Sequence, residues 1–486
     1  MATSGIGSIS SAGIGSGLDV SSIVTQLMAV EQRPLEQLKS QATSLGSKLS
    51  TVGKLQGYFS ALRDKANALT LSTLWSATTA TSANTAVKVS TGPGAVAGSY
   101  AVAVTRLAQG QTLISGALPA STSTLNEGTL TIELGQYLAG TPAAGFNPKA
   151  GSSAVTINIG SGETSLATVR DKINSANAGI TATLITDASG TRLSLRSNDT
   201  GAENAFRVAV TEAVDDNNPA TGLSALAYDA AAAASSPMLR KQAADNSDLT
   251  INGIQINTAS NTLNDVVDGL TLNLSATTTG PVDVSVTADT TSIKTAITDF
   301  VAAFNTLASF IKAQTAYNAD SKSGGALQGD QSTLSLQNQL RGVINEGSSA
   351  SSVWSRLSDI GLAMKVDGTL DTNAGKLDNA LGKLAELKKL LATDGASSAE
   401  SGFVRRFKQL ADAALGSEGV FESRSATLRA NVTRNSKSQE AMEQRLAQTR
   451  ARLQSQYSAL DTKMATLGNL STYMTQQIAQ FNKSTG

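Results

Sequence analysis

Two side-chain types that carry much of enzyme chemistry are missing from this sequence. Its 486 residues contain no His and no Cys. Their absence excludes Ser-His-Asp and Cys-His nucleophiles, imidazole or thiolate metal ligands, and disulfides. A carboxylate pair or a Ser/Lys mechanism would still be available, but no convergent pair of such residues is evident along the chain. We therefore rank catalysis below a structural or binding function.

A glycine series near the start has some of the character of a phosphate-binding loop. Gly13, Gly15 and Gly17 precede a predicted helix. A dinucleotide-binding fingerprint, however, needs a third glycine where Leu18 stands, and it follows a strand that this sequence does not predict. Residues 1–17 combine glycine and serine with isolated Ile, which is typical of a flexible leader. We expect no cofactor there.

Two short acidic motifs, Asp215-Asp216 and Gly329-Asp330, could in principle supply oxygen ligands to calcium. Neither has the spaced carboxylates of an EF-hand loop. Surface turns explain both motifs better, so the sequence predicts no metal site.

Charge gives little indication of a nucleic-acid or membrane partner. Basic and acidic side chains number 38 each, so neither nucleic acid nor an anionic membrane is favoured. The C-terminal helices are locally basic, but few aromatic residues lie nearby for base stacking. Solvated helix faces or the rims of subunit contacts explain this set better: Arg405, Arg406, Lys408, Arg424, Arg429, Arg434, Arg445, Arg450 and Arg452.

The strongest pattern is a pair of apolar stripes at the two ends of the chain. Such stripes are buried only against another helix. An intramolecular antiparallel hairpin and packing between protein subunits both fit, and the sequence leaves both open. The residues that we select as assembly contacts, six of them spaced one heptad apart near the C-terminus, are Leu18, Ile23, Leu27, Leu38, Leu45, Leu446, Leu453, Leu460, Leu467, Met474 and Phe481.

The elements that carry the N-terminal stripe have recognisable boundaries. Asp19 and Ser21 are candidate N-caps of a first helix. Pro34 should interrupt that helix and disfavour helical structure at Arg33, with a longer helix then running to about Leu71.

Between the helical ends, small and β-branched residues alternate as in half-buried strands. One clear helix, 166–176, lies among the predicted strands. The strands include residues 100–104, 129–134, 155–159, 180–185, 192–196, 206–210, 249–256, 270–274 and 282–286.

The helical period returns from Ile293, with helices expected at 334–340, 377–391, 403–415 and along the final heptads. Asp367-Gly368 signals a hairpin, because this dipeptide suits the positive φ angles of a type I′ turn.

These segments predict a multidomain α+β protein with coiled-coil-like ends and nested, mainly β insertions. We expect terminal segments at 1–42 and 441–486, and a helical domain from 43–75 with 289–440. A first β domain is expected at 76–110 with 246–288, and a second is inserted at 111–245. No apolar run is long enough to span a membrane, and no cleavable secretion signal is evident.

Several motifs, taken in order, resemble the family of bacterial flagellar filament cap proteins (hook-associated protein 2). Residues 166–185, with Ile173-Asn174, are also similar to a motif shared with flagellins. The other segments that carry the resemblance are 15–20 with 23–28, Gly98-Ser99-Tyr100 with Val102, Val104, Leu107 and Ala108, then Asn261, Asp265 and 269–272, then Asp289-Thr290, Phe300-Val301, Phe304-Asn305, 327–330, 359–362 and 367–370.

This resemblance implies a secreted, extracellular protein at the tip of the flagellum, exported through the flagellar type III channel. It implies a ring of identical subunits that guides flagellin into the filament without catalysis. Flagellin, hook–filament junction proteins and an export chaperone are the implied partners. Another axial component, such as a junction protein or a flagellin, is one alternative. A secreted adhesin whose residues 111–245 bind host mucin or glycans is the other.

Overall fold

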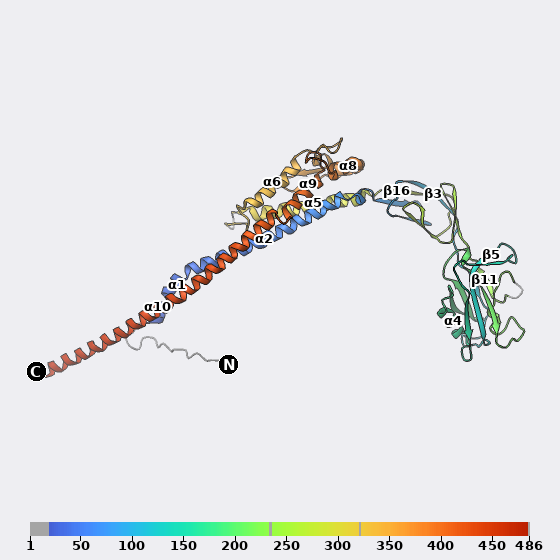
Figure 1. The fold of residues 1–486 in the computed structure, drawn as a ribbon, viewed down its shortest axis with the longest axis horizontal. Coiled ribbons are helices and arrows are strands. Elements are labelled where there is room, and N and C mark those ends of the chain that lie inside the picture. Colours follow the sequence, from blue (N-terminus) through green and yellow to red (C-terminus); the bar gives the residue numbers. More distant parts are fainter. Residues whose placement is uncertain (1–18, 233–235, 320–321, 485–486) are drawn as a thin grey trace. The chain divides into compact units, whose positions relative to one another are not determined.

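The computed structural model describes residues 19–232, 236–319 and 322–484 and confirms the mixed α+β fold class (Figure 1). Residue contacts divide the chain into two compact units. The helical unit comprises 1–74 with 290–486, and the β unit comprises 75–289. The first boundary falls within the short helix α3 (Ser72–Trp75), between Leu74 and Trp75.

The helical unit is dominated by long helices, with two small hairpins and a short 3₁₀ turn between them. The helices are α1 (Val20–Glu31), α2 (Arg33–Thr70), α5 (Thr290–Thr315), α6 (Gln331–Asn345), α7 (Ala374–Leu381), α8 (Leu384–Ala392), α9 (Phe403–Leu415) and α10 (Val420–Ser484). The remaining elements are β17 (Tyr317–Asn318), β18 (Ser323–Gly324), η4 (Leu357–Ile360), β19 (Leu362–Met364) and β20 (Leu370–Thr372).

The start of the helical unit follows its sequence signals closely. The carboxylate of Asp19 caps α1 by accepting a hydrogen bond from the Ser22 N–H at 2.9 Å. Pro34 interrupts the first helix, as predicted, because proline has no N–H to continue the helical hydrogen bonds. It lies in the first turn of α2, where a residue without an N–H is tolerated. The predictions for Arg33 and Ser21 were wrong, since Arg33 opens α2 and Ser21 lies inside α1.

Helix α2 forms the centre of the helical unit, packing against α5, α9 and α10. Phe59 of α2 meets Phe421 of α10 edge-on, with ring centroids 5.1 Å apart. Phe407 of α9 contacts both Phe300 and Phe304 of α5, at 5.3 and 5.7 Å. With so few aromatic residues in the chain, these rings are concentrated where three helices meet α2, and aromatic pairs of this geometry add to the burial energy.

Two local predictions in the helical unit need correction. The stretch 377–391 is two helices, because the chain turns at Gly382-Lys383 between α7 and α8. The Asp367-Gly368 hairpin joins β19 and β20 as predicted, but it is not type I′, since only Gly368 has a positive φ (87°). The Gly368 N–H donates a hydrogen bond to the Lys365 carbonyl at 3.0 Å, and the Lys365 N–H donates one to the Thr369 carbonyl at 2.7 Å. A four-residue turn ending in a left-handed glycine gives this pattern.

The β unit contains two bodies, each with its own apolar core. Its strands are β1 (Thr78–Ser82), β2 (Val87–Thr91), β3 (Gly98–Arg106), β4 (Thr112–Ile114), β5 (Gly128–Tyr137), β6 (Phe146–Pro148), β7 (Val155–Ile159), β8 (Ile180–Asp187), β9 (Gly190–Ser197), β10 (Ala205–Glu212), β11 (Leu239–Gln242), β12 (Ser247–Ile251), β13 (Ile254–Thr258), β14 (Thr262–Val267), β15 (Leu270–Leu274) and β16 (Val282–Ala288). The helix α4 (Leu166–Ser175) and the 3₁₀ turns η1 (Ala202–Asn204) and η2 (Ser224–Leu226) complete it.

What we call the first β body consists of β1–β3 and β12–β16. Its sheets have the orders β1-β16-β3-β12-β13 and β14-β15-β2, and Val102, Val104 and Leu272 lie in its core. The second β body consists of β4–β11 with α4. Its sheets are β10-β5-β6, with β7 also on β5, and β11-β4-β9-β8.

The alternating run 249–256 is not one strand. Asn252 and Gly253, with φ of 50° and 79°, turn the chain between β12 and β13. Both central residues of a type I′ turn need a positive φ, which an Asn-Gly pair adopts readily. That dipeptide was the signal in the sequence that would have divided the run.

The loop before η4 depends on one carboxylate. Glu386 of α8 accepts hydrogen bonds from the Ser351 hydroxyl at 2.8 Å and the Ser352 N–H at 3.0 Å, and pairs with Lys389 at 2.8 Å. The Lys389 ammonium and these two serines lower the pKa of Glu386 to about 2, from 4.5.

We expect Glu386→Gln to reduce the stability of the helical unit at pH 7. Because the pKa of Glu386 is lower in the folded chain than in the unfolded chain, the ionised carboxylate stabilises the folded state at pH values above 4.5. This contribution is lost as the pH falls from 4.5 towards 2. Urea unfolding at pH 7 and at pH 2.5 should therefore show a variant–parent difference that shrinks at the lower pH. Glu440→Gln, at an exposed position on α10, is the control, and an equal Glu386→Gln effect at both pH values would contradict this account.

Candidate functional site

The two terminal stripes meet in an antiparallel helix pair within the helical unit (Figure 1). Helix α10 runs back along α2 and α1, so residues further along α10 contact residues earlier in the chain. Phe421 packs on Phe59, and Asn435 hydrogen-bonds to Gln41 at 3.4 Å. Further on, Leu446 shares one apolar cluster with Leu35. The intramolecular hairpin is therefore present, and it accounts for part of the stripe.

The inner part of the pair is held by apolar contacts. Val24, Met28, Leu35 and Leu446 are each 7% exposed or less. Around them pack the partly buried side chains of Val20, Met442, Leu453 and Tyr457. Burying each such aliphatic side chain stabilises the pair by roughly 1.5–3 kcal/mol relative to full exposure.

The selected residues are consequently divided between two environments. Leu446 is buried, and Ile23, Leu38, Leu45 and Leu453 are half-buried in the helical unit. Leu27 is more open, with 38% of its surface exposed. Leu18 and the glycine series at 13–17 lie outside the described residues.

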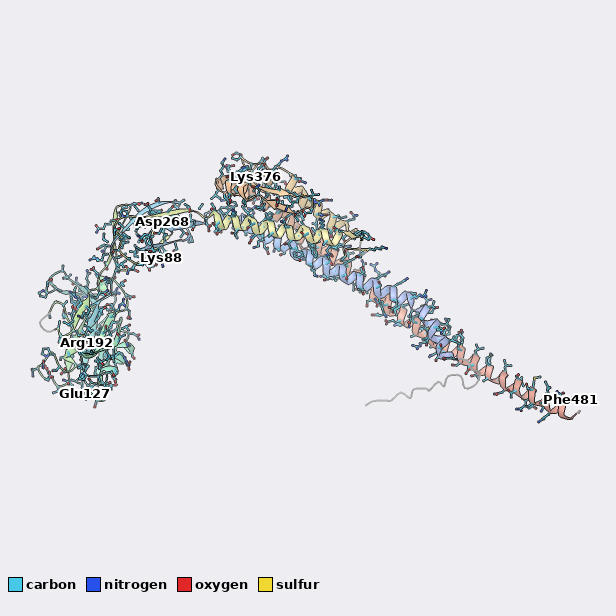
Figure 2. The ribbon with its side chains drawn as sticks, turned by 180° about the vertical axis from the view of Figure 1, so that it is seen from behind. Lys88, Glu127, Arg192, Asp268, Lys376 and Phe481 are labelled. Atoms are coloured by element: carbon cyan, nitrogen blue, oxygen red, sulfur yellow. The ribbon has the colours of Figure 1, made fainter. Side chains whose placement is uncertain are left out.

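The outer part of α10 carries an exposed apolar stripe. We call it the distal stripe and define it as Leu460, Met464, Leu467, Met474, Ile478 and Phe481, which are 44% to 71% exposed. Figure 2 shows this end of α10, with Phe481 labelled, extending beyond the other helices of the helical unit. An apolar stripe of this length on an exposed helix is typical of a site of protein–protein interaction.

The change from buried to exposed has a geometric cause. The pairs Phe421–Phe59 and Leu446–Leu35 show an antiparallel register: as the residue number along α10 rises, the residue number of its partner falls. At that register the partner of Tyr457 lies near Val20, where α1 begins. Beyond Tyr457 this register runs past the start of α1, and Leu460 and Leu467 are 44% and 61% exposed.

The basic residues of the C-terminal helices do not form a uniform solvated face. Arg406 is only 4% exposed and donates hydrogen bonds to the carbonyls of Ser401 and Gly347, both at 3.0 Å. Arg424 forms an ion pair with Asp330. The prediction that these basic residues lie on solvated helix faces was wrong for Arg406, because its buried guanidinium hydrogen-bonds to carbonyls of two separate loops.

The two acidic motifs also differ from each other. The carboxylate of Asp216 accepts hydrogen bonds from Asn218 N–H and Thr221 Oγ1 within its own loop, which confirms the surface turn. Asp330 is 8% exposed and caps α6 by accepting from the Thr333 N–H at 3.0 Å. The surface-turn prediction was therefore wrong for Asp330.

Three asparagines in the motifs that we had singled out share one structural role. Each side-chain amide pairs with both the N–H and the carbonyl of a single residue, at distances of 2.6 to 2.9 Å. The amide thus satisfies two backbone groups at once. The pairs are Asn174 with Ala182, Asn261 with Ala108, and Asn305 with Leu370. These motif residues position backbone segments.

In the described part of the chain, no cluster of three or more His, Cys, Asp or Glu residues could hold a metal ion. None of the helices described combines the length and apolar character needed to cross a bilayer.

Paired terminal helices, a two-body β insertion and an exposed apolar helix end define a structural assembly protein. Comparison with known families gives three matches: flagellar hook-associated protein 2 N-terminus over residues 16–111, its C-terminus over 244–469, and the flagellin hook IN motif over 144–199. This chain belongs to the flagellar hook-associated protein 2 family. The last match contains α4, where the sequence resembles flagellins.

Individual relatives agree along the whole length. Flagellar hook-associated protein 2 of Escherichia coli K12 is 34% identical over 490 residues, covering 98% of this chain and 99% of the relative. The B-type protein of Pseudomonas aeruginosa is 29% identical over 98% of both chains. The crystal structure of the E. coli flagellar cap protein FliD, domains D1-D2-D3, aligns with a TM-score of 0.57 at 32% identity, covering 78% of this chain and 99% of that one.

The two halves of the α10 stripe should respond differently to the same substitution. We expect Leu446→Ala to weaken the helix pair by about 2–5 kcal/mol, because it leaves a cavity against α1 and α2. Leu467→Ala should change stability by less than about 0.5 kcal/mol in the isolated protein, since its side chain is 61% exposed. Hydrogen exchange of the α1 amides measures the stability of the helix pair in both variants. Equal protection of these amides in Leu446→Ala and Leu467→Ala would contradict the division of the stripe into a buried and an exposed part.

Proposed function

We propose that this chain is a structural subunit of the cap at the distal tip of the bacterial flagellar filament. It promotes ordered flagellin polymerisation and prevents flagellin from leaking into the medium, without catalysis. The full-length similarity to relatives that include a solved flagellar cap protein supports this function. The single structural observation that carries it is the distal stripe on α10.

The distal stripe supplies the assembly contact. Its six apolar side chains lie at heptad spacing along one helix face, so another helix can bury them by knobs-into-holes packing. Each side chain covered in this way contributes roughly 1.5–3 kcal/mol. Helical ends of flagellin in the growing filament, or of neighbouring copies of this chain, are the occupants that we propose.

The other proposed partners follow from the same placement. Copies of this chain form a ring at the extracellular filament tip, above the hook–filament junction proteins. An export chaperone would cover the distal stripe inside the cell, because an exposed apolar helix otherwise promotes aggregation. Binding of host mucin by residues 111–245 stays a prediction that nothing yet tests, and the family matches do not favour the adhesin or other axial alternatives.

Leu460→Asp tests the proposed function directly. A charge placed in the distal stripe should prevent burial of the stripe and abolish filament growth, because an unpaired buried carboxylate is strongly unfavourable. Electron microscopy of a cap-deletion strain complemented with the variant measures filament length, and immunoblotting of the medium measures unpolymerised flagellin.

A matched control lies in the same turn of α10. Thr462→Asp introduces the same charge two residues later, on a different face of the helix, and should leave filaments and motility normal. Normal motility in Leu460→Asp would contradict the proposed role of the stripe. Loss of motility in both variants would show that the charge acts on α10 in general.

A further inference from the structure

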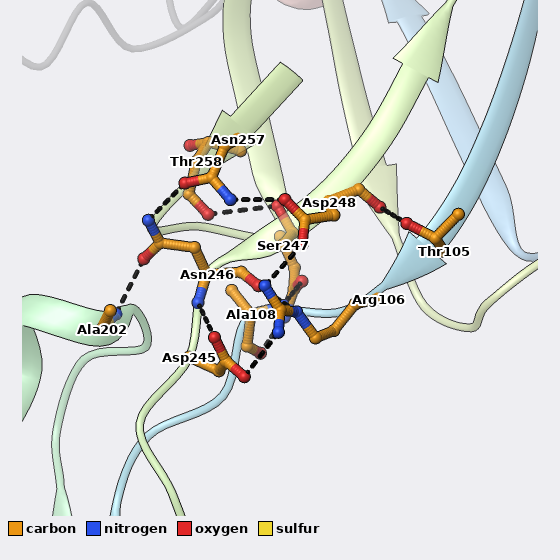
Figure 3. A network of polar contacts seen from close by, with 11 residues as sticks. Thr105, Arg106, Ala108, Ala202, Asp245, Asn246, Ser247, Asp248, Asn257 and Thr258 are labelled. Atoms are coloured by element: carbon orange, nitrogen blue, oxygen red, sulfur yellow. Dashed lines mark hydrogen bonds and ion pairs between the residues drawn. The ribbon is translucent and has the colours of Figure 1, made fainter. Parts of the chain in front are cut away.

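The chain crosses between the two β bodies twice, at residues 107–111 and 243–246. Two short crossings alone would permit the bodies to rotate against each other. At this junction, however, side chains of the first body and of the returning crossing form one polar network, which also binds the backbone N–H of Ala202 in the second body (Figure 3).

Arg106, the last residue of β3, is the first centre of the network. Its guanidinium contacts the Asp245 carboxylate at 2.9 Å, the Asp248 carboxylate, and the Asn246 carbonyl at 3.1 Å. One planar side chain thereby holds the returning crossing and the start of β12 against the end of β3 (Figure 3). A guanidinium can do this because its N–H groups form a rigid fork.

Asn246 is the second centre, and it reaches both bodies. Its Oδ1 accepts a hydrogen bond from the N–H of Ala202 in η1 of the second body, at 2.7 Å. Its Nδ2 donates to Oδ1 of Asn257 in β13 of the first body, at 2.6 Å. The Asn257 amide in turn donates to Asp248, which also pairs with Arg106.

Direct contacts between the bodies lie beside this network. The Thr200 hydroxyl of the second body donates to the Ala259 carbonyl of the first, at 2.7 Å. Gly201 has a φ of 108°, and a Cβ there would lie 2.4 Å from the Ala259 methyl group. The crossings also pair with each other, through two backbone hydrogen bonds of 2.8 and 2.9 Å between Gln109 and Asp245.

We propose that Arg106 and Asn246 lock the two β bodies into one rigid arm and so fix the orientation of the second body. Each ion pair of Arg106 is partly exposed and contributes little alone. Together the contacts restrain the junction more than each does alone, because the Arg106 guanidinium and the Asn246 amide each bind partners on separate segments. Fixed orientation at this junction would present the second body at a constant position in every subunit.

Distance measurements between the two bodies test this proposal. Because the sequence contains no Cys, Lys88→Cys in β2 and Ala188→Cys in the β8–β9 turn give two unique positions for nitroxide labels, both exposed. Pulsed dipolar spectroscopy of the labelled full-length chain should give one narrow distance distribution. Adding Arg106→Ala and Asn246→Ala should widen it at least about twofold, since domains without a strong interface move relative to each other.

The controls separate the lock from general destabilisation. Arg170→Ala removes an arginine of α4 that pairs with the adjacent Asp171, and the distribution should stay narrow. Arg106→Lys should give an intermediate width, because an ammonium cannot hold all three acceptors in one plane. Circular dichroism must show that every variant is folded; if Arg106→Ala with Asn246→Ala is not folded, the distribution of Arg106→Lys decides.

Two outcomes would overturn the proposal. A broad distribution in the labelled parent would show a flexible junction. Distributions that stay narrow after removal of Arg106 and Asn246, or in Arg106→Lys where that variant decides, would show that other contacts hold it. Because the measurement uses the isolated protein, either result leaves the proposed role of the distal stripe unaffected.

Discussion

Apolar packing between α10 and the α1–α2 pair is the interaction on which the helical unit depends. It joins residues near both ends of the chain, with Leu35 against Leu446 at one end and Phe59 against Phe421 at the other. Helices α5 and α9 then pack on α2 around Phe300 and Phe407. The same packing leaves Leu460, Met464 and Leu467 of α10 largely exposed, and thereby creates the surface proposed for assembly.

The β unit is organised by polar side chains that replace backbone partners. At the edge strand of a sheet, or where the chain crosses between bodies, backbone N–H and carbonyl groups would otherwise be unpaired. Asn261 fills this role for Ala108, and Asn174 does so for Ala182. Such amides must reach both backbone groups at once, so an aliphatic side chain of similar size could not replace them. These two motif asparagines are thus explained by the backbone groups that they satisfy.

Much of the fold could be predicted from local pattern. Two-residue alternation identified the strand at Val155–Ile159, and apolar spacing identified α9 at Phe403–Leu415. The failures occurred where a feature interrupts a continuous pattern, as at Gly382 between α7 and α8. Burial of Arg406 and Asp330 was also missed, because a buried charged residue is recognised only when its partners from distant segments are known.

The sequence by itself determined that both ends carry apolar stripes, since heptad spacing is a local property of each helix. It also determined the class of protein, through motifs that resemble those of one family, in order, along nearly the whole chain. Only the tertiary structure decided which part of the α10 stripe is internal, namely Leu446 to Tyr457, and which part is open, from Leu460 onward. The physical reason is the register of the antiparallel helices. Which residues of α10 are buried depends on where α1 begins relative to α10, and this register follows from packing between residues far apart in the sequence.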